Sequence, residues 1–276
     1  MIHLQANKTP RPLLLAVLSA FSLLAYLAAS HLVYRIGFPL DDAWIHQTYA
    51  RNLALNGEWA FLRGVPSAGS TAPLWSALLA VGFWIGAGPY IWSYLIGWLL
   101  LFSTAWTGTE TFRLLVPRHS DWAVWAGVLL AFEWHLVWAA GSGMETLASG
   151  LIALLVLTRL IAGTGSWVLT GALIGVSAWI RPDGITLLGP AVFVLFLDRS
   201  HRSRMLRSAG ELSLGFLLVF APYLIFNRVL AGAWWPNTFF AKQAEYAVLR
   251  DLPLTRRIFQ QVSLPCLLYT SPSPRD

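Results

Sequence analysis

Long apolar runs that carry no charged side chain constrain this chain more than any other feature. The first run, residues 12–34, is long enough to cross a bilayer as a helix, and a soluble core has no need of such a run. Hydrophobic residues make up 57% of the chain and charged residues only 12%, well outside the usual soluble range. The sequence therefore predicts an all-α integral membrane protein.

Basic residues in the connectors predict how these runs are oriented. Apolar runs occur at residues 12–34, 73–88, 90–109, 122–140, 144–162, 166–180, 183–197 and 212–227. Lys and Arg collect in cytoplasmic loops, so the most basic connector, residues 198–209, is expected in the cytoplasm together with the N-terminus. If the run 73–88 also crossed the membrane, that connector would lie outside. We therefore expect seven transmembrane helices, with two interfacial helices in a first external loop at residues 35–89.

The net charge of +6 does not indicate a nucleic-acid partner, because the basic residues sit in short connectors between apolar runs. Residues 266–276 resemble a translated sequencing-library adapter, and we expect this tail to be foreign to the protein. The single cysteine, Cys266, lies in that tail, so cysteine usage says nothing about the redox compartment. We expect residues 1–230 to form one transmembrane module and residues 231–265 to begin a truncated C-terminal region.

Two adjacent carboxylates, Asp41 and Asp42, follow the first apolar run. Neighbouring negative charges repel each other and are costly to desolvate, so an otherwise apolar chain needs a reason to carry them. One interpretation is a hydrated N-cap of a helix. The other interpretation is a catalytic acid pair at the membrane surface.

A surface helix is expected to begin at this acid pair and to end before Gly57. An apolar residue recurs every four positions along it, which predicts a stripe that faces lipid and consists of Ile45, Tyr49 and Leu53. Asp42 and His46 are also four residues apart and therefore share another face. A second surface helix is expected over residues 73–88, with Thr71 as its cap.

On this topology, polar side chains from four separate connectors reach the outer face, as expected of a site at the membrane boundary. Besides the acid pair they are His46, Arg51, Glu145, Arg181, Asp183, Asn237 and Lys242. Each also has a structural interpretation: Glu145 could cap the helix that follows it, and Arg181 could simply pair with Asp183 across a turn. Lys242 could be an anchor at the membrane interface, and His46 an interfacial hydrogen-bonding residue.

The segments that carry these residues resemble those of the polytopic glycosyltransferases of the GT-C fold, which use lipid-phosphate-linked sugars. The resemblance is closest to the arabinofuranosyltransferase-like and protein-mannosyltransferase-like members. The matching segments are DDAWI and YARNL in residues 41–53, GSTAPLW in 69–75, GME in 143–145, RPDG in 181–184, and PNTF with AK in 236–242. One segment departs from the family's pattern, because residues 65–71 read VPSAGST where close members often carry an aromatic-rich sequence with a Glu.

The resemblance implies a seven-span catalytic module that transfers a sugar, with inversion, from a polyprenyl-phosphate donor to an acceptor hydroxyl on a glycan or a protein. It also implies a multi-pass protein of the cell (inner) membrane with an extracytoplasmic active site, which serves cell-envelope glycan or glycoprotein synthesis. Carried over to this chain, Asp41 or Asp42 is the general base.

The residue types suit this chemistry in their own right. Glycosyl transfer needs a carboxylate that takes the acceptor proton. It also needs a cation that stabilises the departing phosphate, for which Lys242, Arg181 and Arg51 are candidates. Asp41 and Asp42 could instead hold a divalent Mg, Mn or Ca ion, although no cofactor is required. The sequence has no glycine-rich phosphate loop after a strand, which argues against a nucleotide-sugar donor.

Two other functions compete with this one. A transporter or flippase for lipid-linked sugars would place charged groups along a path at mid-membrane. An assembly scaffold of an envelope-polymer complex would use its 15 Trp residues only as interfacial anchors. The position of the acid pair at the end of an apolar run favours the enzyme.

Overall fold

The computed structural model describes residues 12–33, 35–163, 165–197, 202–245, 247, 252–259 and 263. The expected foreign tail at residues 266–276 lies outside this part of the chain, as does Arg199 of the basic connector. The described residues are mostly helical, as predicted.

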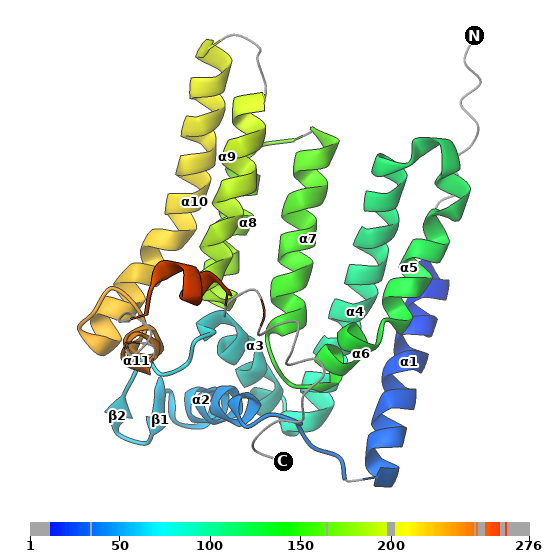
Figure 1. Ribbon diagram of the computed structural model, residues 1–276. Coiled ribbons are helices and arrows are strands. Elements are labelled where there is room, and N and C mark those ends of the chain that lie inside the picture. The colour runs from blue at the N-terminus through cyan, green and yellow to red at the C-terminus, as the bar shows by residue number, and fades with distance from the viewer. Residues whose placement is uncertain are drawn as a thin grey trace.

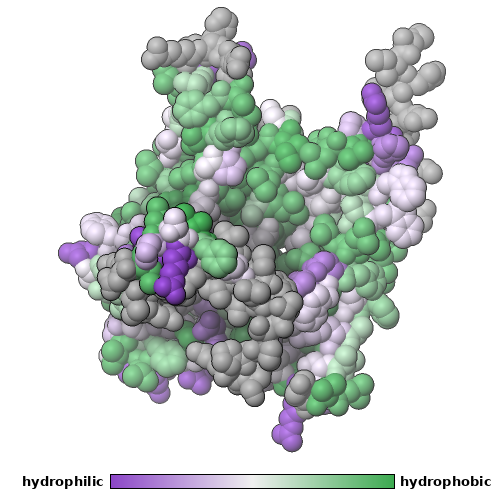
Figure 2. Space-filling model, viewed as in Figure 1, coloured by the Kyte–Doolittle hydropathy of each residue, from purple (hydrophilic) through white to green (hydrophobic). Residues whose placement is uncertain are grey.

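A set of helices runs side by side along the length of the molecule (Figure 1). In chain order they are α1 (Pro12–Val33), α4 (Gly88–Leu115), α5 (Ala123–Phe132), α7 (Thr146–Ala162), α8 (Trp167–Ile180), α9 (Leu188–Leu197) and α10 (Arg202–Ala231). Two short 3₁₀ helices, η1 (Pro117–Trp122) and η2 (Pro182–Leu187), precede α5 and α9. Figure 2 shows hydrophobic side chains along much of the helices, while hydrophilic ones gather chiefly towards their ends.

A second group of elements covers one end of these helices (Figure 1). It comprises α2 (Asp42–Asn56), α3 (Pro73–Trp84), α11 (Asn237–Glu245) and the antiparallel strands β1 (Ala60–Leu62) and β2 (Val65–Pro66). The sequence predicted α2 and α3 but neither α11 nor the hairpin, whose strands are too short to give an alternating pattern.

Two or three helices are long and apolar enough to cross a membrane, which indicates membrane association. The two are α1, with 22 residues, and the 28-residue part Arg204–Ala231 of α10. Four further apolar segments, α3, α7, α8 and η2 with α9, are shorter: α7, with 17 residues, is about 25 Å long, less than the roughly 30 Å hydrocarbon core. Seven spans therefore remain a prediction.

The predicted span at residues 122–140 is broken at Glu133. This residue ends α5 and caps α6 (Trp134–Gly141), because its Oε2 accepts a hydrogen bond of 2.8 Å from the Leu136 N–H. The two halves are bent by 52° and count as a third membrane-crossing segment only if they form one span.

Helix α2 begins and ends where the sequence predicts. The Oδ1 atom of Asp41 accepts a hydrogen bond of 3.0 Å from the Asp42 N–H at the first turn, and Gly57 ends the helix in the left-handed region at φ 68°. The prediction that its apolar stripe faces lipid is wrong. Tyr49 is 1% exposed, and Leu53 packs against the buried cluster that contains Trp75 of α3. The stripe is apolar because protein covers it.

Helix α3 is capped by Ala72 rather than by the predicted Thr71, and Pro73 occupies its first turn. Its inner face, with Trp75 and Leu79, packs against α2 and α4. The hydroxyl of Thr71 is thus not used for capping, and Thr71 instead lines the cavity described below.

Candidate functional site

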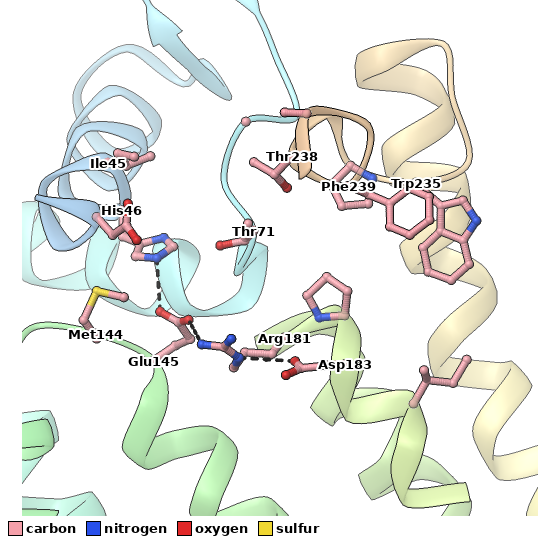
Figure 3. A pocket seen from close by; sticks show the side chains of 16 residues that line it. Ile45, His46, Thr71, Met144, Glu145, Arg181, Asp183, Trp235, Thr238 and Phe239 are labelled. Atoms are coloured by element: carbon pink, nitrogen blue, oxygen red, sulfur yellow. Dashed lines mark hydrogen bonds and ion pairs between the residues drawn. The ribbon is translucent and has the colours of Figure 1, made fainter. Parts of the chain in front are cut away.

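A cavity of about 620 Å³ lies at the end of the molecule where α2, η2, the α6–α7 turn and α11 meet. Its volume is within the range of small-molecule sites. Polar residues cluster on one part of its wall: Asp42, His46, Thr71, Glu145, Arg181 and Asp183. Figure 3 shows His46 of α2, Glu145 at the start of α7, and Arg181 and Asp183 of the corner at η2 pointing toward one another.

Glu145 is the centre of this polar cluster. Its side chain is 3% exposed, and its Oε1 accepts a hydrogen bond of 2.9 Å from Nη1 of Arg181. Its Oε2 lies 3.1 Å from Nε2 of His46, which is an ion-pair distance. No donor among the described residues points at Oε2 with full hydrogen-bond geometry, however. One buried carboxylate therefore joins α2 to the corner that follows α8.

The turn between α6 and α7 places Glu145 in this position. Gly143 has a φ of 72°, which favours glycine, and its carbonyl accepts a hydrogen bond of 3.0 Å from Nε1 of Trp75 in α3. The Met144 N–H donates to Oγ of Ser142 at 3.1 Å. Glu145 precedes α7 but its carboxylate makes no capping bond, so the capping interpretation does not hold and the side chain is free to reach His46.

The surroundings of Glu145 favour its charged form. Burial raises the pKa of this carboxyl. The contact with His46, the charge of His46 and the charge of Arg181 together lower the pKa by more than burial raises it. The net pKa is below the ordinary value of a glutamate. The group is therefore an anion near neutral pH.

His46 is nearly as buried as Glu145 and has partners on both ring nitrogens. Its Nδ1 lies 3.3 Å from Oγ of Ser70 and 3.2 Å from Oγ of Ser76, and these two hydroxyls are 2.9 Å apart. If Nε2 carries the proton that faces Glu145, neutral Nδ1 can accept from either serine. The sequence predicts only an interfacial hydrogen-bonding residue at His46, because the spacing along α2 cannot reveal what α3 places beside it.

Arg181 bridges two carboxylates at the start of η2. Besides Glu145, it contacts Asp183, whose Oδ1 lies 3.2 Å from Nε. The pairing of Arg181 with Asp183 that the sequence suggested is thus present, together with the contact to Glu145, which lies 36 positions away in the chain. Gly184 packs so closely on Ser177 of α8 that a side chain there would overlap it, which fixes the corner against α8. The guanidinium side chain remains 36% exposed at the cavity wall.

The two tandem aspartates have different surroundings. Asp42 is exposed and lines the cavity, and no hydrogen bond or ion pair engages its carboxylate within the described part of the chain. Asp41 does not line the cavity, and its carboxylate accepts from the backbone of Asp42. Asp42 is therefore the carboxylate that a ligand in the cavity can reach.

Besides Asp41, three predicted site residues do not contribute a described side chain to the cavity. Arg51 is exposed on α2 away from it. Asn237 is exposed, and its backbone N–H donates to the carbonyl of Ala68 at 3.3 Å, which ties the start of α11 to the loop after β2. The side chain of Lys242 lies outside the described atoms, although its backbone belongs to α11.

Opposite the polar cluster, the cavity has an aromatic wall that the sequence analysis missed. Trp235 and Phe239 line it, with ring centroids 5.5 Å apart and planes inclined by 28°. Pro236 between them is buried and also lines the cavity. Aromatic residues at the end of an apolar run are typical of interfacial anchors, so their pattern in the sequence does not predict a binding role.

A divalent cation would find few grouped protein ligands among the described residues. Across the ranges that the structure describes, no three His, Cys, Asp or Glu side chains are grouped to hold an ion. A divalent cation would therefore need most of its ligands from substrate phosphate and water.

No family model, curated protein or solved structure matches this chain. We therefore infer the function from the cavity and its residues.

Proposed function

We propose that this protein is a membrane glycosyltransferase that moves a sugar from a polyprenyl-phosphate donor to an acceptor hydroxyl. The observation that carries the proposal is the composition of the cavity wall. Asp42, whose carboxylate has no partner among the residues that the structure describes, lines the same 620 Å³ cavity as Arg181, which two carboxylates hold in place. A free base and an oriented cation in one cavity are the two groups that this reaction requires.

The reaction uses these groups in one displacement. The acceptor oxygen attacks the anomeric carbon and forms the new glycosidic bond, while the bond from that carbon to the phosphate oxygen breaks. The phosphate leaves with the electron pair, and the acceptor proton passes to the carboxylate of Asp42. Arg181 stabilises the negative charge that develops on the phosphate. A single attack from the opposite face inverts the anomeric centre.

The rest of the cavity suits a donor that is both anionic and apolar. Trp235 and Phe239 give it an apolar wall across from the charged cluster (Figure 3), and Ile185 of η2 adds another apolar side chain to the lining. The prenyl chain would lie along this wall and leave the phosphate near Arg181. The carboxylate of Asp42 and the guanidinium of Arg181 do not determine which sugar or acceptor is used. Other residues would select them.

The proposal includes a location. In it, the chain forms a seven-span GT-C module in the cell membrane with the cavity on the extracytoplasmic side. Connectors that alternate along the chain support this arrangement: the turn before Glu145 and the corner at Arg181 lie at the cavity, whereas η1 lies at the opposite end (Figure 1). The basic connector at residues 198–209 favours a cytoplasmic position for that opposite end.

A transfer assay with the two aspartates tests the proposal. Membranes that contain the protein are incubated with radiolabelled pentosyl- and hexosyl-phosphate polyprenols, and the label in glycan and protein is measured. Asp42→Asn should lower the transfer rate by about 10²- to 10⁴-fold, the range for loss of a general base. Asp41→Asn is the matched control and should retain most of the rate, because its carboxylate does not line the cavity.

Two outcomes would count against the proposal. One is the absence of transfer above that of membranes without the protein for every donor. The other is a transfer rate in Asp42→Asn equal to that of the wild type, which would remove the base from the mechanism.

A further inference from the structure

We propose that His46 is a positioning residue that holds Arg181 at the cavity wall through Glu145. The inference rests on the proposed function only where it concerns the donor phosphate. The side chains of His46 and Arg181 are linked by the carboxylate of Glu145, which contacts both.

The carboxylate of Glu145 is divided between its two partners. Oε1 is engaged by Arg181 at 2.9 Å and Oε2 faces His46 at 3.1 Å, so each oxygen is held from a different side. The contact with His46 is the weaker of the two, because Oε2 has no aligned donor among the described residues. Without the imidazole, Oε2 would be a buried oxygen with no partner at all, which is costly.

A carboxylate that loses one partner turns toward the other. Glu145 would then rotate both oxygens onto the guanidinium, since a bidentate pair with arginine is the favoured geometry. That rotation would draw Arg181 away from Asp183 and from the open part of the cavity. His46 thus keeps the guanidinium from being occupied by Glu145 alone.

The imidazole is itself held from behind by a pair of serines. Ser76 belongs to α3 and Ser70 to the loop whose neighbours Gly69 and Thr71 line the cavity. Both hydroxyls are buried and lie within 3.3 Å of Nδ1. The orientation of the ring, and so the distance from Nε2 to Glu145, is set by α3 and by this loop.

Two substitutions that differ by one methylene test the inference. In His46→Asn the amide can reach the serines but not Glu145, whereas in His46→Gln the longer side chain brings an amide donor to the former position of Nε2. Both variants stay polar and small enough for the site. His135→Asn is the control, since His135 makes the other short contact between a His and a Glu, 2.6 Å from Glu133, and does not line the cavity.

The first readout is the position of Arg181 itself. The rate at which phenylglyoxal modifies Arg181 is measured by mass spectrometry of the peptide, in the absence of any donor. His46→Asn should change this rate by about threefold or more, the scale of a charge-assisted hydrogen bond that is lost or remade. His46→Gln and His135→Asn should stay within a factor of two of the wild type. An unchanged rate in His46→Asn would overturn the positioning role.

The second readout is the dissociation constant of farnesyl phosphate, followed by tryptophan fluorescence because Trp235 lines the cavity. His46→Asn should weaken binding about tenfold, and His46→Gln should restore it, as expected for one charge-assisted contact. In an Arg181→Gln background, His46→Asn should weaken binding no further, because the effect passes through Arg181. Additive losses would instead show an independent role and would overturn the inference.

The two readouts separate this inference from the proposed function. If the modification rate of Arg181 responds to His46→Asn but the wild type does not bind farnesyl phosphate, the positioning role stands and the proposed donor is wrong. If farnesyl phosphate binds and neither readout responds, the proposed donor stands and the role of His46 is wrong.

Discussion

At the scale of single residues, Glu145 makes the strongest link between charge and stability. It is buried between an imidazole and a guanidinium, and its pKa is lowered from the ordinary value. A carboxyl with a lowered pKa in the folded state contributes stability that is present above the unfolded pKa. This stability is lost as the pH falls through the folded pKa.

Glu145→Gln should therefore change how stability depends on pH. In the wild type, the midpoint of thermal unfolding in detergent should fall as the pH drops below about 4.3, the unfolded pKa of a glutamate. In Glu145→Gln, the decrease of the unfolding midpoint in this pH range should be smaller. At pH 7 the variant should be less stable by about 3 kcal/mol, because His46 and Arg181 lose a shared buried partner.

Glu211→Gln is the matched control for this change. Glu211 pairs with Arg207 one turn away on α10, where the arginine side chain is 82% exposed. Loss of such a surface pair costs at most about 1 kcal/mol. Equal pH profiles in Glu145→Gln and the wild type would contradict the assigned surroundings of Glu145.

The sequence predicted part of this cluster and missed part of it for a physical reason. Asp42, Glu145 and Arg181 could be grouped because each sits in a connector, and alternate connectors of antiparallel helices reach the same end. The role of His46 depends on Ser76 of α3, thirty positions away, and no spacing rule relates two helices that pack across each other. The sequence likewise could not show which of Asp41 and Asp42 lines the cavity, because that depends on the direction of the first turn of α2.

At the scale of elements, α8 and α10 owe their close contact to glycines. A Cβ on Gly171 of α8 would overlap the carbonyl of Leu212, and a Cβ on Gly215 of α10 would overlap the carbonyl of Val168. Small residues allow helix backbones to approach in this way, which matters most where lipid provides no hydrophobic driving force. The packing of α8 against α10 helps to position the corner at Arg181, because η2 follows α8 directly.

Gly215→Ala should destabilise the protein by about 1–3 kcal/mol, the usual cost of overpacking, because the α10 backbone must move away from Val168. Gly210→Ala on the same helix has open space around the new methyl group. It should be neutral or stabilising by up to about 1 kcal/mol, because alanine favours the helix. The midpoints of thermal unfolding in detergent measure both effects, and equal midpoints would contradict the packing.

Trp75→Phe should loosen the turn that presents Glu145. The indole N–H is the donor to the carbonyl of Gly143, and its loss would leave a buried acceptor unpaired at a cost of about 1–3 kcal/mol. We expect a lower unfolding midpoint together with weaker binding of farnesyl phosphate. Trp84→Phe is the control: its indole donates to Ala54 at 3.0 Å in an exposed place, where water replaces the lost bond. Unchanged binding in Trp75→Phe would separate the turn from the site.

The limits of sequence patterns also show at this scale. The four-residue period through Ile45, Tyr49 and Leu53 correctly predicted a helix with an apolar face. It could not tell lipid from protein as the cover, because both are apolar, and protein covers Tyr49 and Leu53. Composition alone likewise gave one span at residues 122–140, whereas Glu133 caps a new helix within it.

At the scale of the whole molecule, the cavity end differs from the opposite end in what its connectors carry. The cavity end has α2, α3, α11 and the ionic cluster, whereas the opposite end has η1 and the approach to the basic connector (Figure 1). Within the described ranges, only two or three helices meet the length and apolarity of a span, so the crossing of the bilayer by the shorter helices needs a direct measurement.

Labelling of two engineered cysteines should place the two ends on opposite sides of the membrane. In a Cys266→Ser background, Arg63→Cys sits in the exposed turn between β1 and β2, and Arg118→Cys in the exposed η1. A membrane-impermeant maleimide should label Arg63→Cys in intact cells but Arg118→Cys only after permeabilisation, because basic connectors remain in the cytoplasm. Both are arginine replacements at exposed sites, so intrinsic reactivity is matched. Labelling of Arg63→Cys and Arg118→Cys from the same side would mean that the two ends of the molecule lie on one side of the membrane. That result would contradict the extracytoplasmic position of the cavity.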